Sequence, residues 1–111
     1  MMDLRQVPPG IVDWAQLDDE VLVGEQGTAA QRARRFQDIQ LRRVDYGPGY
    51  VADHWCAKGH ILFVVAGALV IEYQDGASDK LSAGMSWHVG EGAAPPHRVV
   101  CLGGAQVFIV D

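Results

Sequence analysis

Apolar residues in this chain occur in short runs, and glycine or polar turn residues separate one run from the next. The clearest runs cover 60–65, 68–73 and 85–89, which are lengths typical of β-strands. After the second run, Gln74-Asp75-Gly76 carries the Asp-Gly signal of a tight hairpin. No segment has the apolar periodicity of a helix longer than about ten residues. The pattern therefore predicts an all-β domain.

The boundaries of the runs give the expected elements. We expect strands at 20–23, 33–44 (interrupted near Asp38), 50–56, 60–65, 68–73, 78–81, 85–89, 97–102 and 106–110. Loops are expected over 24–30 and 90–96, and a tight turn is expected at Ala66-Gly67. Many short strands at this spacing are typical of a sandwich or a barrel.

Length and charge narrow the class of protein. The 111 residues correspond to one domain. A formal net charge of −5 argues against a nucleic-acid partner, which needs a basic surface. The longest apolar run is shorter than the roughly 20 residues of a membrane span, and residues 1–10 lack the apolar core of a signal peptide. We therefore expect a cytoplasmic protein without a membrane partner, in which Cys56 and Cys101 are thiols.

Three histidines and one cysteine have a spacing that suggests a metal site. His54 and Cys56 are two residues apart, so on a strand they face the same side. His60 follows a break at Gly59, and His97 begins a late strand directly after two prolines. Imidazole and thiolate favour a divalent transition metal, with zinc first, iron second, and nickel or copper as further candidates.

The same residues resemble the two conserved motifs of cupins. The first cupin motif is matched in spacing by Gly49, His54-Trp55-Cys56, His60 and Gly67. The second corresponds to Gly84, Gly90-Glu91-Gly92, His97 and Cys101, with Gly90 in place of the family's proline and a longer loop before His97. Cys56 stands where the family has its second histidine, and His60 stands where it has a glutamate. The resemblance implies a single-domain cupin, which is a jelly-roll-like double-stranded β-helix forming a small barrel.

A narrower resemblance is carried by the run 52–62, which contains Asp53-His54-Trp55-Cys56, by Pro96-His97-Arg98 and by the ending 108–111. It is similar to the small bacterial cupins with a DHCW motif, a group for which no reaction is assigned. The resemblance implies a barrel over 33–111 and an N-terminal segment over 1–32. That segment contains a candidate dimer-exchange strand, so a homodimer is expected.

The sequence thus predicts a metal-binding cupin of unassigned activity, with His54, Cys56, His60 and His97 as ligands. A pocket for an unidentified small molecule is expected inside the barrel, and its lining or the surroundings of the metal are predicted to include Leu62, Val99 and Cys101. One alternative is a non-catalytic binding or sensing module that the metal stabilises. A further alternative is an iron-dependent oxygenase, or a metal-dependent isomerase or lyase, acting on a small organic acid. Trp55 is expected on the outer side of its strand, and the sequence leaves open whether Glu72 or Tyr73 faces inward.

Overall fold

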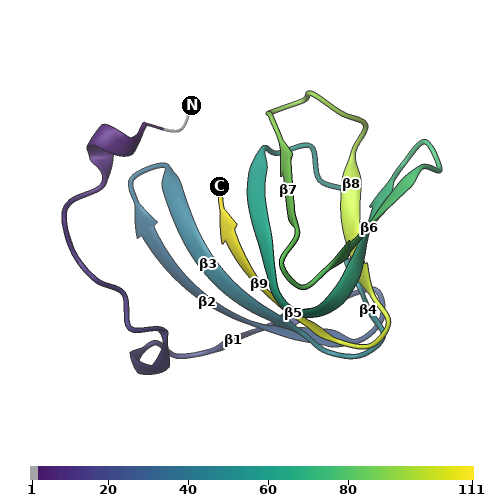
Figure 1. The fold of residues 1–111 in the computed structure, drawn as a ribbon, viewed down its shortest axis with the longest axis horizontal. Coiled ribbons are helices and arrows are strands. Elements are labelled where there is room, and N and C mark those ends of the chain that lie inside the picture. The colour runs from purple at the N-terminus through teal and green to yellow at the C-terminus, as the bar shows by residue number, and fades with distance from the viewer. Residues whose placement is uncertain (1–2) are drawn as a thin grey trace.

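Strands form nearly all of the regular structure in the computed structural model, which describes residues 3–111 (Figure 1). Two single 3-10 turns, η1 (Leu4–Gln6) and η2 (Trp14–Gln16), come first. The strands are β1 (Glu20–Val23), β2 (Thr28–Phe36), β3 (Ile39–Tyr46), β4 (Tyr50–Val51), β5 (His60–Tyr73), β6 (Ser78–Ser82), β7 (Ser86–Val89), β8 (His97–Cys101) and β9 (Ala105–Val110). The all-β prediction is confirmed. Within residues 3–111, no helix is long and apolar enough to cross a membrane.

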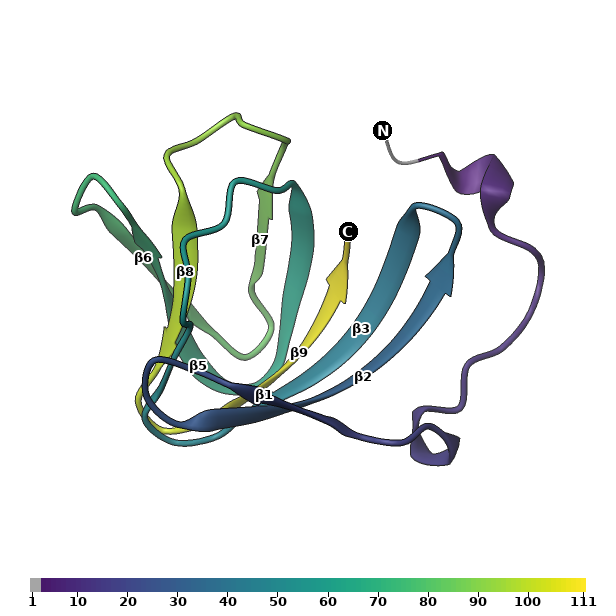
Figure 2. The ribbon, with the colours of Figure 1, turned by 180° about the vertical axis from the view of Figure 1, so that it is seen from behind.

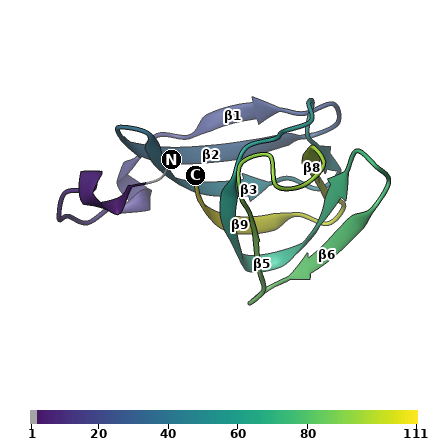
Figure 3. The same ribbon diagram turned by 90° about the horizontal axis from the view of Figure 1, so that it is seen from above.

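Two sheets share β5 and curl around one interior. The large sheet contains β1, β2, β3, β9, the first half of β5 and β7, all paired antiparallel. The small sheet contains β4, β8, the second half of β5 and β6. Figure 2 shows the large sheet from behind, with β1 crossing in front of the other strands, and Figure 3 shows the two sheets from above. The interior is therefore walled on two sides.

Every second side chain of the central strands points inward, and these apolar side chains fill the closed part of the interior. On β9, Val107 and Ile109 point inward and are at most 3% exposed. On β5, Leu62 and Val64 do the same on the adjacent strand. Burying one such side chain contributes about 1.5–3 kcal/mol to stability. The core thus holds the two sheets together and leaves the end of the barrel near the C-terminus for a site.

The start of β2 shows that the loop expected over 24–30 is shorter than the sequence predicts. Residues 24–30 are not all loop, because β2 begins at Thr28 and pairs Ala29 with Tyr46. The glycine signal marks only the tight passage at Gly27, where φ is +67°. The expected interruption near Asp38 is a hairpin turn between Phe36 and Ile39.

The expected turn at Ala66-Gly67 is also wrong. β5 continues through both residues for 14 residues in all, with a β-bulge between Val64 and Ala66. Gly67 has φ of +77°, and a Cβ at this position would collide with the carbonyl oxygen of Gly104. A bulge followed by a glycine bends a strand without ending it. This bend carries β5 from the large sheet into the small sheet.

Candidate metal centre

Cys56, His60 and His97 form one group of metal-ligating side chains. One donor atom from each residue lies within 4.8 Å of the donors of the other two. Cys56 belongs to the loop after β4, and its backbone exchanges two hydrogen bonds of 2.8 and 2.9 Å with His97 of β8. His60 begins β5. Three separate segments therefore bring one thiol and two imidazoles together.

His97 is buried, and its ring nitrogens make no hydrogen bond of normal geometry within residues 3–111. Its exposed fraction is 5%. Burial lowers the pKa of His97 and the neighbouring His60 lowers it further, against a smaller opposing effect of the Pro95 carbonyl. A neutral imidazole is the form that binds a metal. A buried imidazole with both nitrogens unsatisfied requires an explanation, and a metal ligand provides one.

Asp111 holds His60 in place. Oδ2 of Asp111 lies 2.8 Å from Nδ1 of His60 and accepts a second hydrogen bond of 2.6 Å from Nη2 of Arg42. Burial raises the pKa of the Asp111 carboxyl, but the hydrogen bond from His60 and the guanidinium of Arg42 outweigh it, so that the pKa lies below its usual value. The other nitrogen of His60, Nε2, is 3.5 Å from Sγ of Cys56. This leaves Nε2 of His60 as the ring nitrogen that faces Cys56 and could bind a metal.

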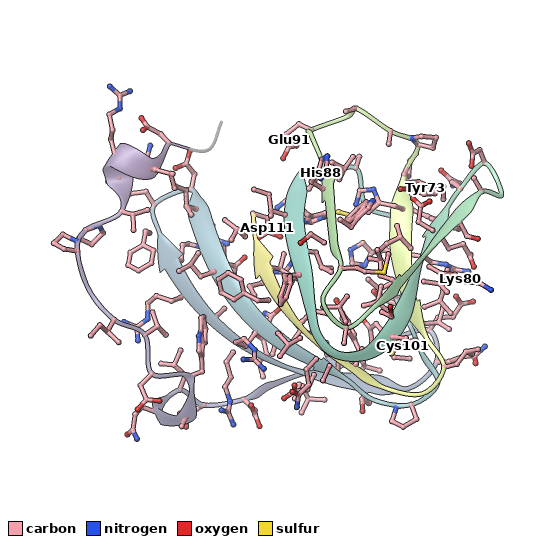
Figure 4. All side chains as sticks on the ribbon, viewed as in Figure 1. Tyr73, Lys80, His88, Glu91, Cys101 and Asp111 are labelled. Carbon is pink, nitrogen blue, oxygen red and sulfur yellow. The ribbon has the colours of Figure 1, made fainter. Side chains whose placement is uncertain are left out.

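Two hydrogen bonds surround the Cys56 sulfur. The backbone N–H of Lys58 donates to Sγ at 3.4 Å, and Nε2 of His60, at the start of β5, lies 3.5 Å from Sγ. The loop itself is tied to the loop after β7, because the N–H of Gly59 donates to Oε1 of Glu91 at 2.9 Å. Figure 4 shows Glu91 and Asp111 at the same end of the barrel. The thiol is therefore held by a loop with its own anchors.

His54 lies outside this group. Its side chain is 76% exposed, and its Nδ1 is 2.6 Å from Oδ1 of the adjacent Asp53. The expected strand 50–56 is wrong, because β4 ends at Val51 and only the isolated bridge at Cys56 returns to the ladder. The two-residue alternation that would place His54 beside Cys56 is therefore absent.

Cys101 also lies away from the group. Its side chain is fully buried, and Sγ donates to the carbonyl oxygen of Ala68 at 3.4 Å. Burial raises the pKa of its thiol. Figure 4 shows Cys101 near the closed end of the barrel, far along the strands from Asp111. Cys101 therefore packs as a small apolar residue.

A cavity of about 460 Å³ opens beside the group. Its lining includes Leu62 and Val99, the two apolar residues that the sequence places in the pocket. Ile109 faces this cavity, whereas Phe108 points outward and packs against Trp14 at 6.2 Å between ring centroids. This volume lies in the range of about 300–1,000 Å³ that is usual for small-molecule sites.

Tyr73 and Glu72 divide between the two faces of β5. Tyr73 packs against the core, and its hydroxyl accepts a hydrogen bond of 3.0 Å from Nε1 of Trp87. Glu72 instead pairs with Arg98 at 2.9 Å. Tyr73 therefore belongs to the aromatic surroundings of His97, whose ring centroid lies 6.5 Å away.

Trp55 lines the cavity, so the expectation that it faces outward is wrong. The loop leaves the sheet at this point, and Trp55 turns under the guanidinium of Arg98, whose Cζ is 4.5 Å from the ring centroid. This distance is typical of a cation–π contact. Arg98 is held in turn by Glu25 at 2.7 Å and by Glu72. Trp55 and Arg98 thus form part of the cavity wall.

The sequence interpretation missed Asp111 and Arg42. Asp111 follows β9 and exchanges backbone hydrogen bonds with Gln40, so the strand alternation continues to it. Asp111 therefore faces inward, as Ile109 and Val107 do. Extending the alternation of the last strand by one step would have placed this carboxylate in the barrel.

Solved structures provide the comparison for this architecture. No family model and no curated protein matches the chain. The RmlC-like cupin from Shewanella frigidimarina superposes with a TM-score of 0.73 and 18% identity over 93% of this chain and 89% of that one. A sugar phosphate isomerase of the cupin superfamily from Silicibacter pomeroyi gives 0.72 and 15% over 91% and 74%. A predicted oxalate decarboxylase from Thermotoga maritima gives 0.70 and 13% over 91% and 96%. This protein therefore has the cupin fold.

Proposed function

We propose that this protein is a metal-binding cupin in which Cys56, His60 and His97 hold one divalent transition metal beside a small-molecule cavity. The observation that supports the proposal is the buried ring of His97, whose two nitrogens make no hydrogen bond of normal geometry within residues 3–111. One thiolate and two imidazoles suit zinc first and iron second, and they also suit nickel or copper. Magnesium and calcium prefer oxygen donors and fit this group poorly.

Three protein ligands leave one position of a tetrahedral shell for a ligand from the cavity. When bound, the metal would supply a Lewis acid at the cavity wall. The protein residues do the rest: Asp111 fixes the tautomer of His60, and Trp55 and Leu62 shape the space beside the site. The neighbours named above include an isomerase and a predicted decarboxylase. An oxygenase, isomerase or lyase acting on a small organic acid is the enzymatic form of this proposal.

Cobalt substitution tests the Cys56 ligand. Protein loaded with Co(II) should show a thiolate-to-cobalt absorption band, because a cysteine ligand binds as the thiolate. The band should disappear in Cys56→Ser and remain in Cys101→Ser, whose sulfur is buried against Ala68. A band that survives in Cys56→Ser would remove Cys56 from the site.

Asp111→Asn tests the positioning of His60. Partners that orient a metal-binding histidine typically account for about 10–100-fold in metal affinity, so the variant should bind zinc about tenfold more weakly. The measurement is competition with a chromophoric chelator. Asp19→Asn is the matched control, since Asp19 also accepts a hydrogen bond from an arginine, Arg32, but does not line the cavity. Unchanged zinc affinity in Asp111→Asn would show that the carboxylate does not act through His60.

The second candidate is a closed, non-catalytic site in which His54 is the fourth ligand. It is favoured by the position of His54 on the same loop as Cys56 and on the cavity lining. This form requires the loop to turn His54 away from Asp53. The cobalt spectrum separates the two forms, since added azide shifts the spectrum of an open site and leaves a closed His3Cys site unchanged.

The proposal extends to grouping, assembly and location. The DHCW motif supports placement with the small bacterial DHCW cupins, and two free thiols suit the reducing cytoplasm.

A homodimer is supported by β1, which forms an edge of the large sheet with Val21 and Val23 mostly exposed. Sedimentation should give the mass of two chains, and a single chain at micromolar concentration would contradict the dimer.

A further inference from the structure

The charges on the cavity wall differ in sign from the charge of the whole chain. The protein has a net charge of −5, yet three cations and one acid line the cavity: Arg42, Lys58, Arg98 and Asp111. A cleft in which one sign of charge predominates attracts ligands of the opposite sign. The wall therefore selects for an anion.

The three cations differ in how far they are already neutralised. Arg98 is paired with Glu25 and Glu72, neither of which lines the cavity. Lys58 is exposed and has no ion pair within residues 3–111. Lys58 is thus the cation that remains available at the cavity mouth.

Arg42 supplies unused hydrogen-bond donors deeper in the wall. Its Nη1 donates to Gln31 at 2.9 Å and its Nη2 donates to Asp111. Its Nε is buried and inaccessible from the cavity, whereas Nη1 and Nη2 each carry a second N–H that these two hydrogen bonds do not use. A guanidinium has five N–H groups in a fixed fork that matches a carboxylate. Because Arg42 and His60 bond to the same oxygen of Asp111, these donors lie next to the metal-ligating group.

Much of the remaining wall is apolar, and Gln40, Tyr46 and Tyr50 add polar atoms to it. Leu62, Ile71, Val99 and Ile109 line the cavity together with the ring of Trp87. An apolar wall favours a ligand with an apolar body, because burying that body contributes about 25 cal/mol per Å².

We infer that the cavity binds a small organic carboxylate with an apolar body, held by Lys58 at the mouth and by the free N–H groups of Arg42. The inference rests on the small-molecule cavity of the proposed function, but the carboxylate site does not need the metal. The carboxylate end carries the recognition, and the apolar end fills the space between the two sheets.

Benzoate is the probe, with benzamide as its uncharged counterpart and inorganic phosphate as an anion without an apolar body. Binding is followed by NMR on the indole N–H signals of the full chain. Trp55 and Trp87 line the cavity, whereas Trp14 packs outside it on Phe108 and serves as an internal reference. Benzoate should shift the signals of Trp55 and Trp87, and its affinity should exceed that of benzamide by at least about fivefold.

Lys58→Met should weaken benzoate binding about threefold, which is the usual value of a partly exposed ion pair. Arg42→Lys keeps the charge and loses the fork, and it should weaken binding about tenfold. Lys80→Met is the matched control, since Lys80 lies outside this cavity, and it should leave the affinity unchanged.

The inference is overturned if benzoate shifts neither cavity tryptophan, if benzamide binds as well as benzoate, or if phosphate binds as well. Titrations of metal-free and zinc-loaded protein, with zinc measured by elemental analysis, separate the two proposals. Protein that holds zinc without binding benzoate overturns the carboxylate site alone. Protein that binds benzoate without holding zinc supports the carboxylate site and overturns the metal site.

Discussion

Replacing His97 by phenylalanine should weaken metal binding roughly a hundredfold and, in the metal-free protein, raise the free energy of unfolding by about 1–2 kcal/mol. The second effect follows from the two ring nitrogens, which are buried without partners. A buried polar group without a hydrogen bond costs about 1–3 kcal/mol, and a phenyl ring of similar shape removes this cost. The phenyl ring would pack against neighbouring aromatic rings, since the centroid of the Trp87 ring is 4.9 Å from that of the His97 ring.

The first effect follows from the loss of a ligand. A structural zinc site with four ligands contributes about 10–16 kcal/mol, so one ligand corresponds to about 3 kcal/mol, or roughly a hundredfold in affinity. Metal-loaded wild type should therefore unfold at a higher temperature than metal-loaded His97→Phe, and the order should reverse after chelation. Thermal unfolding with and without EDTA measures both effects.

His88→Phe is the control for this comparison. His88 is exposed and lies outside the ligand group, so the substitution should change neither zinc content nor the stability of the metal-free protein. If metal-free His97→Phe is less stable than wild type, the imidazole has a structural partner in solution, and the proposal loses its main support.

The sequence predicted the positions of the candidate site residues correctly where they lie on a regular strand, and it failed where the strand ends earlier or later than expected. His60 and His97 each begin a strand, and the ladder fixes where they point. The placement of His54 used strand alternation in a segment that leaves the sheet after Val51. Asp111 was missed for the converse reason, since the pairing with Gln40 continues beyond the end of β9. Which backbone segments pair is a tertiary property, and a single strand pattern does not encode it.

The wrongly expected turn at Ala66-Gly67 has a similar cause, because a glycine can serve different structures. The sequence correctly predicts a turn at Gln74-Asp75-Gly76, where the chain reverses between β5 and β6. At Gly67 the same residue type serves a bulge in a continuous strand. Both glycines have positive φ, so local conformation does not distinguish them. The difference is the neighbouring strand, because Gly67 lies against Gly104 and Ala105 of a segment far along the chain.

Gly67→Ala should therefore be one of the most destabilising single substitutions in the barrel. A positive φ costs a residue with a Cβ about 1–2 kcal/mol, and the collision with the Gly104 carbonyl adds to it. We expect a total loss of about 3 kcal/mol or more, which is a large part of the 5–15 kcal/mol usual for a domain. Urea unfolding of the metal-free protein, followed by tryptophan fluorescence, gives this value.

Gly76→Ala isolates the contribution of the close approach. Gly76 has φ of +97°, but nothing lies within 4 Å of the position that its Cβ would take. Gly76→Ala should therefore lower the free energy of unfolding only by the cost of the positive φ, about 1–2 kcal/mol. Equal losses in the two variants would mean that β5 can move away from Gly104 at no cost. The bend at Gly67 would then not fix the angle between the two sheets, and the position of His60 relative to His97 would have to be set elsewhere.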